Sequence, residues 1–269
     1  MDTTTPTGFL GTNLNQSTLV EIKGKLESIK RNHYFNLVQS KSPKKEMLKL
    51  STEAMGYSYP QTHCFRGYPI LDSFKQFTDS YADYILHFDC DMIFYEAPNF
   101  SWIEEGIRIM EENEDILCVL PKGGPPKKNH TLNQGTTPYH YDKKRGLYLF
   151  KNFTSRHYLI HRERFLSLLP MKPLWLSWRE PLKSRFLGYG KMLCWEAIVE
   201  KALECSSFWR ADLMSDDAWS LHPVDRSVHF YKLLPKIIDC VHRNQFPEKQ
   251  RGHFDLNLEE WDIYLKQHQ

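Results

Sequence analysis

Two hydrophobic periodicities alternate along this chain. Apolar residues recur at three- and four-residue spacing in several segments, which predicts amphipathic helices. Short apolar runs between these segments predict strands of a buried sheet. Such alternation predicts an α/β fold with a mostly parallel central sheet and helices on both faces. Helices are predicted near residues 17–32, 44–55, 70–81, 101–113, 163–169, 194–205, 233–243 and 258–268, and strands near 34–38, 62–65, 84–88, 116–120, 146–150 and 158–160.

Two carboxylates one residue apart close the most strand-like of these runs. Asp89 and Asp91 follow the apolar segment 84–88, at the point where the strand leaves the sheet. In an open α/β sheet this carboxyl end is where ligands bind. Two hard oxygen ligands there suit Mg²⁺ or Mn²⁺. The alternative is a strand followed by a solvated turn, in which the two acids only cap the strand.

Composition narrows the class of protein. The 269 residues are 41% hydrophobic and 25% charged, as in ordinary soluble domains. The formal net charge of +2 argues against a dedicated nucleic-acid binder, which would carry a strong basic excess. Aromatic residues reach 14%, and aromatic faces commonly line sugar sites, although core packing also uses them.

Cysteine usage and the absence of apolar leaders indicate a cytoplasmic protein. The six cysteines have no Cys-x-x-Cys spacing, which favours reduced thiols over a disulfide frame or a zinc site. No apolar run approaches 18 residues, so no transmembrane segment is expected. The N-terminus lacks the charged and apolar regions of a signal peptide.

Three features in this order resemble the GT-A glycosyltransferases, most closely the broad family 2 class. They are Asp89-Cys90-Asp91 at a strand end, Trp195-Glu196 at the head of a predicted helix, and Trp219-Ser220-Leu221-His222-Pro223 downstream. The resemblance covers roughly residues 8–230. It implies a metal-dependent enzyme that moves a sugar from a nucleotide-sugar donor to a hydroxyl acceptor such as a saccharide, with inversion.

The resemblance also implies a domain plan. One Rossmann-type, GT-A-like domain would span residues 1–269, because no internal repeat or low-complexity linker divides the chain. Residues 1–14 would form a loop, 15–120 the nucleotide-binding half and 121–230 the acceptor half. Residues 231–269 would form C-terminal helices.

The resemblance implies that three residues take part in metal and donor binding. Asp89 and Asp91 take the place of the family's Asp-x-Asp and would bind the donor diphosphate through Mn²⁺ or Mg²⁺. Asp91 would be the direct ligand, and Asp89 would contact the ribose or a metal-bound water. His222 takes the place of a third ligand, and neutral imidazole suits Mn²⁺. The alternative for His222 is a surface histidine before a proline turn.

Catalysis falls on Glu196 in the same resemblance. It takes the place of the general base, which works best when partly desolvated. Trp195 would offer the acceptor a stacking face. The family usually has Glu-Asp here, whereas this chain has Trp195-Glu196-Ala197. Asp216 and Asp217 are therefore rival bases, and a carboxylate that only complements the helix dipole is the alternative for Glu196.

Two other functions stay open. The family's fold opens with an apolar strand that residues 1–14 do not contain, which leaves a non-catalytic protein on a degenerate transferase fold. A Mg²⁺-dependent phosphohydrolase also places paired acids at a strand end. That class usually has Asp-x-Asp-x-Thr near the start of the chain, and Ile93 stands here in the Thr place.

Cationic residues gather in two segments. Residues 121–151 carry seven lysines and arginines behind a Gly- and Pro-rich turn, and form either a solvated loop or a basic flap near an anionic donor or acceptor. Residues 170–195 are dense in aromatic and cationic side chains. This second segment suggests peripheral contact with a membrane that carries a lipid-linked acceptor.

Overall fold

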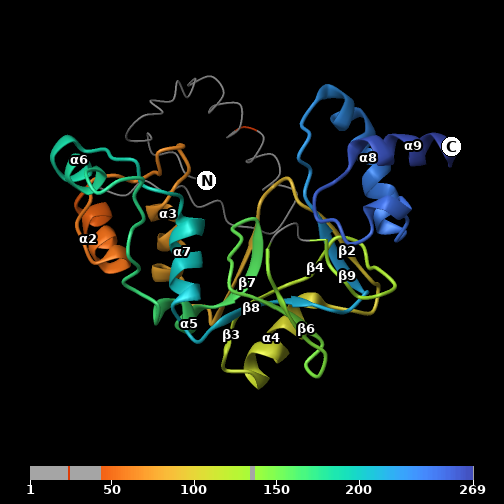
Figure 1. Ribbon diagram of the computed structural model, residues 1–269, viewed down its shortest axis with the longest axis horizontal. Coiled ribbons are helices and arrows are strands. Elements are labelled where there is room, and N and C mark those ends of the chain that lie inside the picture. The colour runs from red at the N-terminus through yellow and green to blue at the C-terminus, as the bar shows by residue number, and fades with distance from the viewer. Residues whose placement is uncertain (1–23, 25–43, 134–136, 269) are drawn as a thin grey trace. The chain divides into compact units, whose positions relative to one another are not determined.

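The computed structural model describes residues 24, 44–133 and 137–268 and divides into two compact units (Figure 1). The first unit contains the described part of Met1–Tyr81 together with Leu166–Ala202, and the second contains Ala82–Phe165 and Leu203–Gln269. The expected helix at 17–32 and strand at 34–38 lie outside the described residues.

The described elements follow one another in a mixed order. The helices are α2 (Lys44–Met55), α3 (Leu71–Thr78), α4 (Trp102–Glu112), α5 (Arg162–Leu166), α6 (Glu180–Leu187), α7 (Trp195–Glu204), α8 (Val228–His242), the 3₁₀ helix η1 (Glu248–Gln250) and α9 (Leu258–Gln267). The strands are β1 (Tyr84–Phe88), β2 (Ile93–Glu96), β3 (Ile116–Leu120), β4 (Lys122–Gly123), β5 (His140–Asp142), β6 (Leu147–Phe150), β7 (His157–His161), β8 (Trp209–Leu213) and β9 (Ala218–Leu221).

The first unit is helical in its described residues. Helices predicted near 44–55, 70–81 and 194–205 are confirmed as α2, α3 and α7. Their apolar faces supply a core that includes Met55, Phe74 and Phe77, all nearly free of solvent contact. The strand predicted at 62–65 is wrong, because this segment makes only an isolated bridge between His63 and Pro69. A helix without a predicted counterpart, α6, occupies part of the aromatic and cationic segment.

The second unit is built on a six-stranded mixed sheet in the order β1-β7-β3-β8-β6-β5. Only the β3–β8 pairing in this sheet is parallel, and the other four pairings are antiparallel. The α/β class is therefore confirmed, but the described strands do not confirm a mostly parallel sheet.

Two of the four antiparallel pairings arise from one inserted strand, β7. β1 and β3 flank helix α4 in the sequence, as in a βαβ unit, and both run antiparallel to β7. They therefore run in the same direction, as the alternation predicts. β7, which comes later in the chain, lies between them and converts one expected parallel pairing into two antiparallel ones. The carboxyl ends of β1, β3 and β8 consequently lie at the same end of the sheet.

Strand β3 and helix α4 form the centre of the core. Every residue of β3 is buried, as its continuous apolar run predicts. Helix α4 begins at the predicted cap, where the Ser101 hydroxyl accepts a hydrogen bond from the Glu104 N–H at 3.3 Å. A Cβ on Gly106 would lie 2.9 Å from the Leu159 side chain, so this glycine lets α4 approach the sheet closely. Figure 1 shows α4 against β3.

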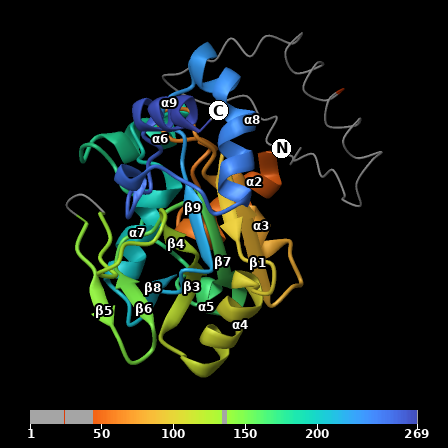
Figure 2. The same cartoon turned by 90° about the vertical axis from the view of Figure 1, so that its right-hand side faces the viewer.

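A second, three-stranded sheet in the order β2-β9-β4 adjoins helices α8 and α9 (Figure 2). β2 runs antiparallel to β9, and β9 runs parallel to β4. Trp219 of β9 and Trp261 of α9 are fully buried in the cluster that joins this sheet to the two helices. The helices predicted near 233–243 and 258–268 are thereby confirmed, with α8 beginning five residues earlier at a Ser227 cap.

Strand β1 is more exposed than its sequence predicts. Leu86 and Phe88 are 40% and 42% exposed because β1 is an edge strand of the described sheet. Phe88 still packs edge-on against Phe94 and Trp102. All six cysteines are free thiols. Among the described helices, none has the length and apolarity that crossing a bilayer requires.

Candidate functional site

The turn that carries Asp89 and Asp91 links the two sheets of the second unit. It leaves β1 after Phe88, and the Met92 N–H donates to the Asp89 carbonyl oxygen at 3.2 Å before β2 begins. β2 pairs with β9 so that Ile93 lies opposite Leu221. Since His222 directly follows Leu221, this register places Asp91 and His222 at the same end of the small sheet.

Asp91 has one oxygen paired and one oxygen unpaired. Its Oδ2 accepts a hydrogen bond from the guanidinium of Arg226, whose side chain is exposed. Its Oδ1 is buried and has no hydrogen-bond partner among the residues that the structure describes. A buried polar atom of this kind costs about 1–3 kcal/mol unless a partner satisfies it. A cation or a water is the kind of partner that suits such an oxygen.

Asp89 is fixed through its backbone. Its N–H donates to the carbonyl oxygen of Arg156 at 2.6 Å, just before β7 begins. Its Oδ1 lies 3.3 Å from Nε2 of His87, and the carboxylate is 42% exposed. The side chain is therefore open to a ligand from solvent while its main chain is held in place.

His222 is buried between an arginine and an aspartate. Its Nε2 lies 2.5 Å from Nη1 of Arg156, and its Nδ1 lies 3.1 Å from Oδ1 of Asp255. A guanidinium can only donate, so Nε2 is the acceptor and Nδ1 carries the proton that is donated to Asp255. The sequence alternative of a surface histidine is therefore wrong: His222 is 5% exposed and fully hydrogen-bonded.

Stacked aromatic rings pack against His222. The Phe254 ring lies between His222 and His157, with centroids 5.9 and 5.8 Å away and nearly parallel planes. Burial lowers the pKa of His157 to about 3, so this imidazole is neutral. Its Nε2 lies 3.2 Å from the Ser220 hydroxyl. His157 therefore packs and orients its neighbours without adding charge.

The three predicted metal ligands are not assembled into one cluster. Among the described residues, no group of three or more His, Cys, Asp or Glu side chains could hold a metal ion. Asp91 fits a cation because its buried Oδ1 lacks a partner within the part of the chain that the structure describes. His222 does not fit as it stands, because Arg156 occupies the only lone pair of its ring. Two guanidinium groups thus lie where the sequence predicts one divalent cation.

Lys122 adds a buried positive charge near this sheet edge. It lies two residues beyond β3, is 1% exposed and pairs with Asp216. Burial lowers the pKa of Lys122, and its hydrogen bond to Asp216 opposes that shift. Asp216, one of the two rival bases, is therefore held in an ion pair. Asp217, the other, accepts a hydrogen bond from the Ser215 hydroxyl at 2.8 Å.

Glu196 and Trp195 lie in the first unit, at the start of α7. Trp195 is 7% exposed, and its ring packs against Phe74 and Phe77 at centroid distances of 6.3 and 6.5 Å. This place is that of a core side chain that anchors the helix. Glu196 is half-buried in the first turn, where the helix dipole favours a carboxylate. The roles of both residues in catalysis and acceptor binding stay predictions.

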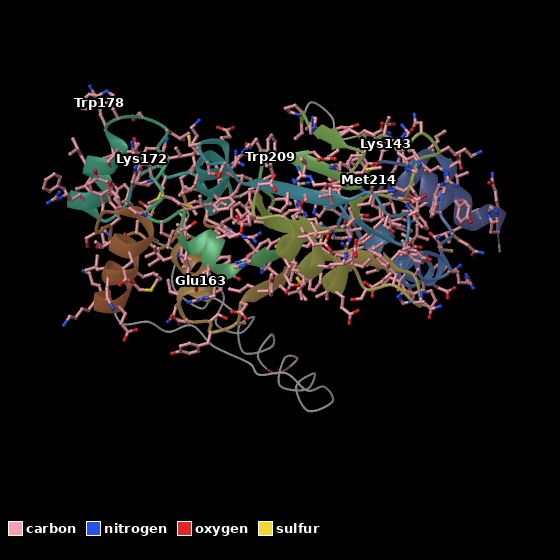
Figure 3. All side chains as sticks on the ribbon, turned by 90° about the horizontal axis from the view of Figure 1, so that it is seen from below. Lys143, Glu163, Lys172, Trp178, Trp209 and Met214 are labelled. Atoms are coloured by element: carbon pink, nitrogen blue, oxygen red, sulfur yellow. The ribbon has the colours of Figure 1, made fainter. Side chains whose placement is uncertain are left out.

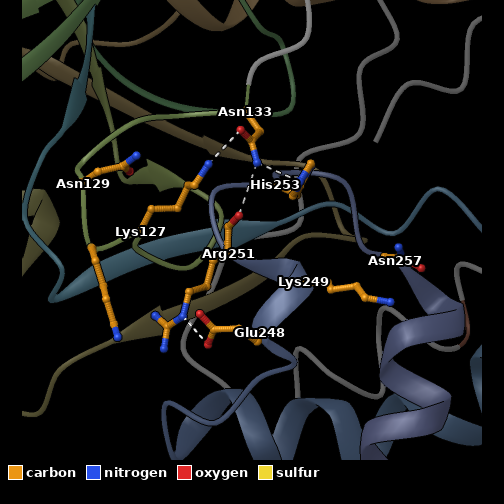
Figure 4. Close-up of a pocket in the computed structure, with 9 residues that line it drawn as sticks. Lys127, Asn129, Asn133, Glu248, Lys249, Arg251, His253 and Asn257 are labelled. Atoms are coloured by element: carbon orange, nitrogen blue, oxygen red, sulfur yellow. Dashed lines mark hydrogen bonds and ion pairs between the residues drawn. The ribbon is translucent and has the colours of Figure 1, made fainter.

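A basic pocket of about 660 Å³ opens elsewhere in the second unit (Figure 4). Four cationic side chains and one carboxylate line it together with four neutral polar side chains. Cationic groups in such excess suit a phosphate or carboxylate group. The lining residues are Lys127, Lys128, Lys249, Arg251 and Glu248, with Asn129, Asn133, His253 and Asn257.

Hydrogen bonds hold the two walls of the basic pocket together. Lys127 Nζ donates to Asn133 Oδ1 at 3.1 Å, and the Asn133 N–H donates to the Gly252 carbonyl at 2.9 Å. Gly252 has φ +73°, and a Cβ there would lie 2.4 Å from the Lys127 side chain, so this turn requires glycine. Lys127 and Lys128, in the segment predicted as either a solvated loop or a basic flap, therefore line a pocket.

One segment connects the basic pocket to His222. It runs from Gly252 to Leu256, and the His222 N–H donates to the Phe254 carbonyl at 2.9 Å. The Leu256 N–H donates back to the His222 carbonyl, also at 2.9 Å. A ligand that orders the 252–256 segment therefore acts on the backbone beside His222.

Sequence reasoning did not single out Arg156 or Arg226. Neither belongs to a motif, and each reaches its partner only through the fold. Arg226 follows His222 by four residues, and the antiparallel pairing of β2 with β9 returns that segment to Asp91, but this contact joins distant segments and has no signal in the sequence. Arg156 likewise reaches its partners only through the insertion of β7.

Comparisons with protein-family models, with curated proteins and with solved structures found no match to this chain.

Proposed function

We propose that this protein is a metal-dependent glycosyltransferase of the GT-A type that moves a sugar from a nucleotide-sugar donor to a hydroxyl acceptor. The observation that carries the proposal is the buried Oδ1 of Asp91, which follows β1 and has no hydrogen-bond partner among residues 24, 44–133 and 137–268. The common direction of β1, β3 and β8 supports it, because ligands bind at the carboxyl ends of such strands. A cytoplasmic location belongs to the same proposal.

Asp91 and Asp89 would hold Mn²⁺ or Mg²⁺, Asp91 directly and Asp89 through water or the ribose. The cation, when bound, would neutralise charge that develops on the leaving diphosphate. His222 could join the ligands after Arg156 releases Nε2. Asp255 would keep the proton on Nδ1 of His222 and so leave Nε2 as the electron-pair donor.

Arg156 and Arg226 would take part in donor binding in this proposal. Arg156 now donates to His222 and Arg226 now pairs with Asp91, two of the residues that the sequence predicts as metal ligands. If a bound cation took their places, the two guanidinium groups would be released to bind the donor diphosphate. A guanidinium binds phosphate oxygens through two parallel hydrogen bonds. This interaction becomes stronger as negative charge develops on the leaving group. Lys122 would add to the same positive potential.

Glu196 would serve as the general base. It would take the proton from the acceptor hydroxyl as that oxygen attacks the anomeric carbon, and the nucleoside diphosphate would leave with the electron pair of the bond that breaks. Packing of Trp195 against Phe74 and Phe77 supports a fixed position for the first turn of α7.

A non-catalytic nucleotide-binding protein is the second candidate. The contacts of Arg156 with His222 and of Arg226 with Asp91 favour it, because guanidinium groups can balance the negative charge of a diphosphate without any metal. In this case nucleotide binding would be insensitive to chelators.

Calorimetric titration with UDP, GDP and CMP, each with Mn²⁺ and with EDTA, separates the two candidates. We expect one nucleotide to bind only with metal, and Asp91→Asn to weaken that binding at least about tenfold. Asp83→Asn, which changes an exposed carboxylate six residues before Asp89, is the matched control and should bind like the wild type. Unchanged binding by Asp91→Asn would refute the transferase proposal, and metal-independent binding would favour the second candidate.

A further inference from the structure

Helix α6 of the first unit presents its apolar side to solvent and its polar side to the protein. Glu180 and Ser184 lie four residues apart on one face and are 5% and 0% exposed. Leu182 and Phe186 lie on the opposite face, 200° around the helix, and are 51% and 77% exposed. A surface helix of a soluble protein normally has the reverse arrangement.

Other exposed apolar side chains lie beside this face. Trp178 precedes Leu182 by four residues and is 75% exposed. Leu187, at the C-terminal end of α6, is 60% exposed although it lies on the Glu180 side of the helix. Leu176 adds a further half-exposed side chain before the helix. Figure 3 shows Trp178 at the outer edge of the ribbon. We call Leu176, Trp178, Leu182, Phe186 and Leu187 the α6 patch, which is too concentrated to be scattered surface residues.

Glu180 on the polar side of α6 is specifically bound, which fixes the orientation of the helix. The Glu180 carboxylate accepts hydrogen bonds from Lys183 Nζ at 2.7 Å and from the Lys191 N–H at 2.8 Å. A Cβ on Gly190 would lie 2.3 Å from the Glu180 carbonyl oxygen, so the following loop packs tightly on the helix. An isolated bridge between Trp175 and Met192 closes the loop from the other side. The outward direction of the α6 patch is thus built into the fold.

Exposed positive charges occur in the same segment as the α6 patch. Arg179, Arg185, Lys172 and Lys191 are all exposed, and the Arg179 guanidinium lies 5.1 Å from the centre of the Trp178 ring. Glu180, the acid within the helix, is buried and paired with Lys183. An apolar face with a tryptophan and a cationic rim is the combination that lies in the headgroup region of a bilayer.

We propose that the α6 patch docks this protein onto the surface of a membrane that contains anionic lipids. Leu182, Phe186 and Trp178 would enter the boundary between headgroups and acyl chains. Arg179 and Arg185 would bind lipid phosphates, because cations near an anionic membrane surface are attracted to it. The charge complementarity favours a lipid surface over a second protein, whose matching face would have to be both apolar and acidic. This docking does not depend on the glycosyltransferase proposal.

Vesicle flotation with the full chain tests the docking. The probes are phosphatidylcholine vesicles with and without about 30% phosphatidylglycerol, a fraction that makes the surface strongly negative. Neither nucleotide nor metal is added. We expect the wild type to float with the anionic vesicles. The double variant Leu182→Gln/Phe186→Gln should lose at least about tenfold of this binding, because two buried apolar side chains account for more than 1.4 kcal/mol.

Two further variants keep the test decisive. Val228→Gln/Ile263→Gln removes exposed apolar side chains from α8 and α9 and should float like the wild type. Arg179→Gln/Arg185→Gln, which leaves the apolar face intact, should lose preference for anionic vesicles. Absence of flotation by the wild type would overturn the proposal, as would equal flotation of the α6 and control variants. Self-association that the α6 variant abolishes, without vesicle binding, would instead assign the α6 patch to a second copy of the chain.

Discussion

The Arg156 guanidinium donates to Nε2 of His222 across 2.5 Å, while the carbonyl oxygen of the same arginine accepts the N–H of Asp89 at 2.6 Å. One residue thus positions the Asp89 turn through its main chain and occupies the free lone pair of His222 through its side chain. Any cation that binds His222 must first displace a positive charge. Arg156 would therefore compete with any metal at His222, and its carbonyl oxygen positions the Asp89 turn.

Arg156→Gln should strengthen metal binding in the absence of nucleotide. The change removes a full charge beside His222 while the backbone bond to Asp89 remains, so we expect the dissociation constant for Mn²⁺ to fall by about threefold to tenfold. Calorimetric titration with Mn²⁺ alone measures this effect. His222→Gln in the same background should reverse it, and weaker binding by Arg156→Gln would contradict the competition.

His157 should make the protein less stable as the pH falls below about 6.5. The unfolded chain takes up a proton on this histidine near pH 6.5, whereas burial lowers the pKa in the folded protein to about 3. The stabilisation is complete above pH 6.5, and between these values it is lost by about 1.4 kcal/mol for each pH unit. Urea unfolding at several pH values should give a flatter dependence for His157→Gln than for the wild type. His140→Gln, at an exposed histidine, is the matched control, and parallel curves for all three proteins would contradict the assignment.

Arg210 and Asp212 form a buried pair whose disruption should be severe. Both side chains are almost fully buried on β8, and two hydrogen bonds of 2.8 and 2.7 Å join them. Arg210→Met would leave the Asp212 carboxylate unpaired in the core and should lower the free energy of unfolding by about 3–5 kcal/mol. Chemical denaturation measures this loss.

A surface arginine with equally good geometry provides the control for Arg210. Arg108 contacts Glu105 and Glu112 at 2.6 and 2.5 Å but is 52% exposed. Arg108→Met should cost less than about 1 kcal/mol, because solvent screens exposed pairs. The double variant Arg210→Met/Asp212→Leu should regain part of the stability, and equal losses in the single and double variants would argue against an unpaired charge as the cause.

The basic pocket should bind small multivalent anions. Pyrophosphate without metal should raise the melting temperature of the wild type, since a ligand of the folded state stabilises it by mass action. Lys127→Ala/Lys128→Ala should reduce this shift, because two of the four cations are removed. Lys143→Ala/Lys144→Ala, at exposed lysines outside the basic pocket, should behave like the wild type. Equal loss in both variants would indicate only nonspecific charge.

Local signals predicted the helices of this protein well. Ser101 and the apolar spacing behind it define α4, and the helix predicted over 44–55 ends at Met55 in the structure as well. These signals are short-range, since caps and periodicity act within a few residues. Strand existence was also readable for β1, β3, β6 and β7, because each is a short apolar run.

Strand order and the direction of side chains were less readable. β7 lies between β1 and β3, although nothing in residues 157–161 specifies that position, and its arrival brings Arg156 to Asp89 and His222. Helix α6 escaped prediction because its apolar residues face outward and its buried face is polar. Asp91 was predicted from its place after a strand, but its partner Arg226 was not, because their contact joins distant segments.

The insertion of β7 also sets the order in which the second unit can be built. During synthesis β1 leaves the ribosome roughly 70 residues before its described sheet partner, and contacts of such separation form slowly. Until then β1 is a free strand edge whose polar backbone groups attract other chains. Arg156 reaches the Asp89–Asp91 turn only when β1 and β7 have paired. The geometry of the candidate site therefore cannot be complete until residues 157–161 have joined the sheet.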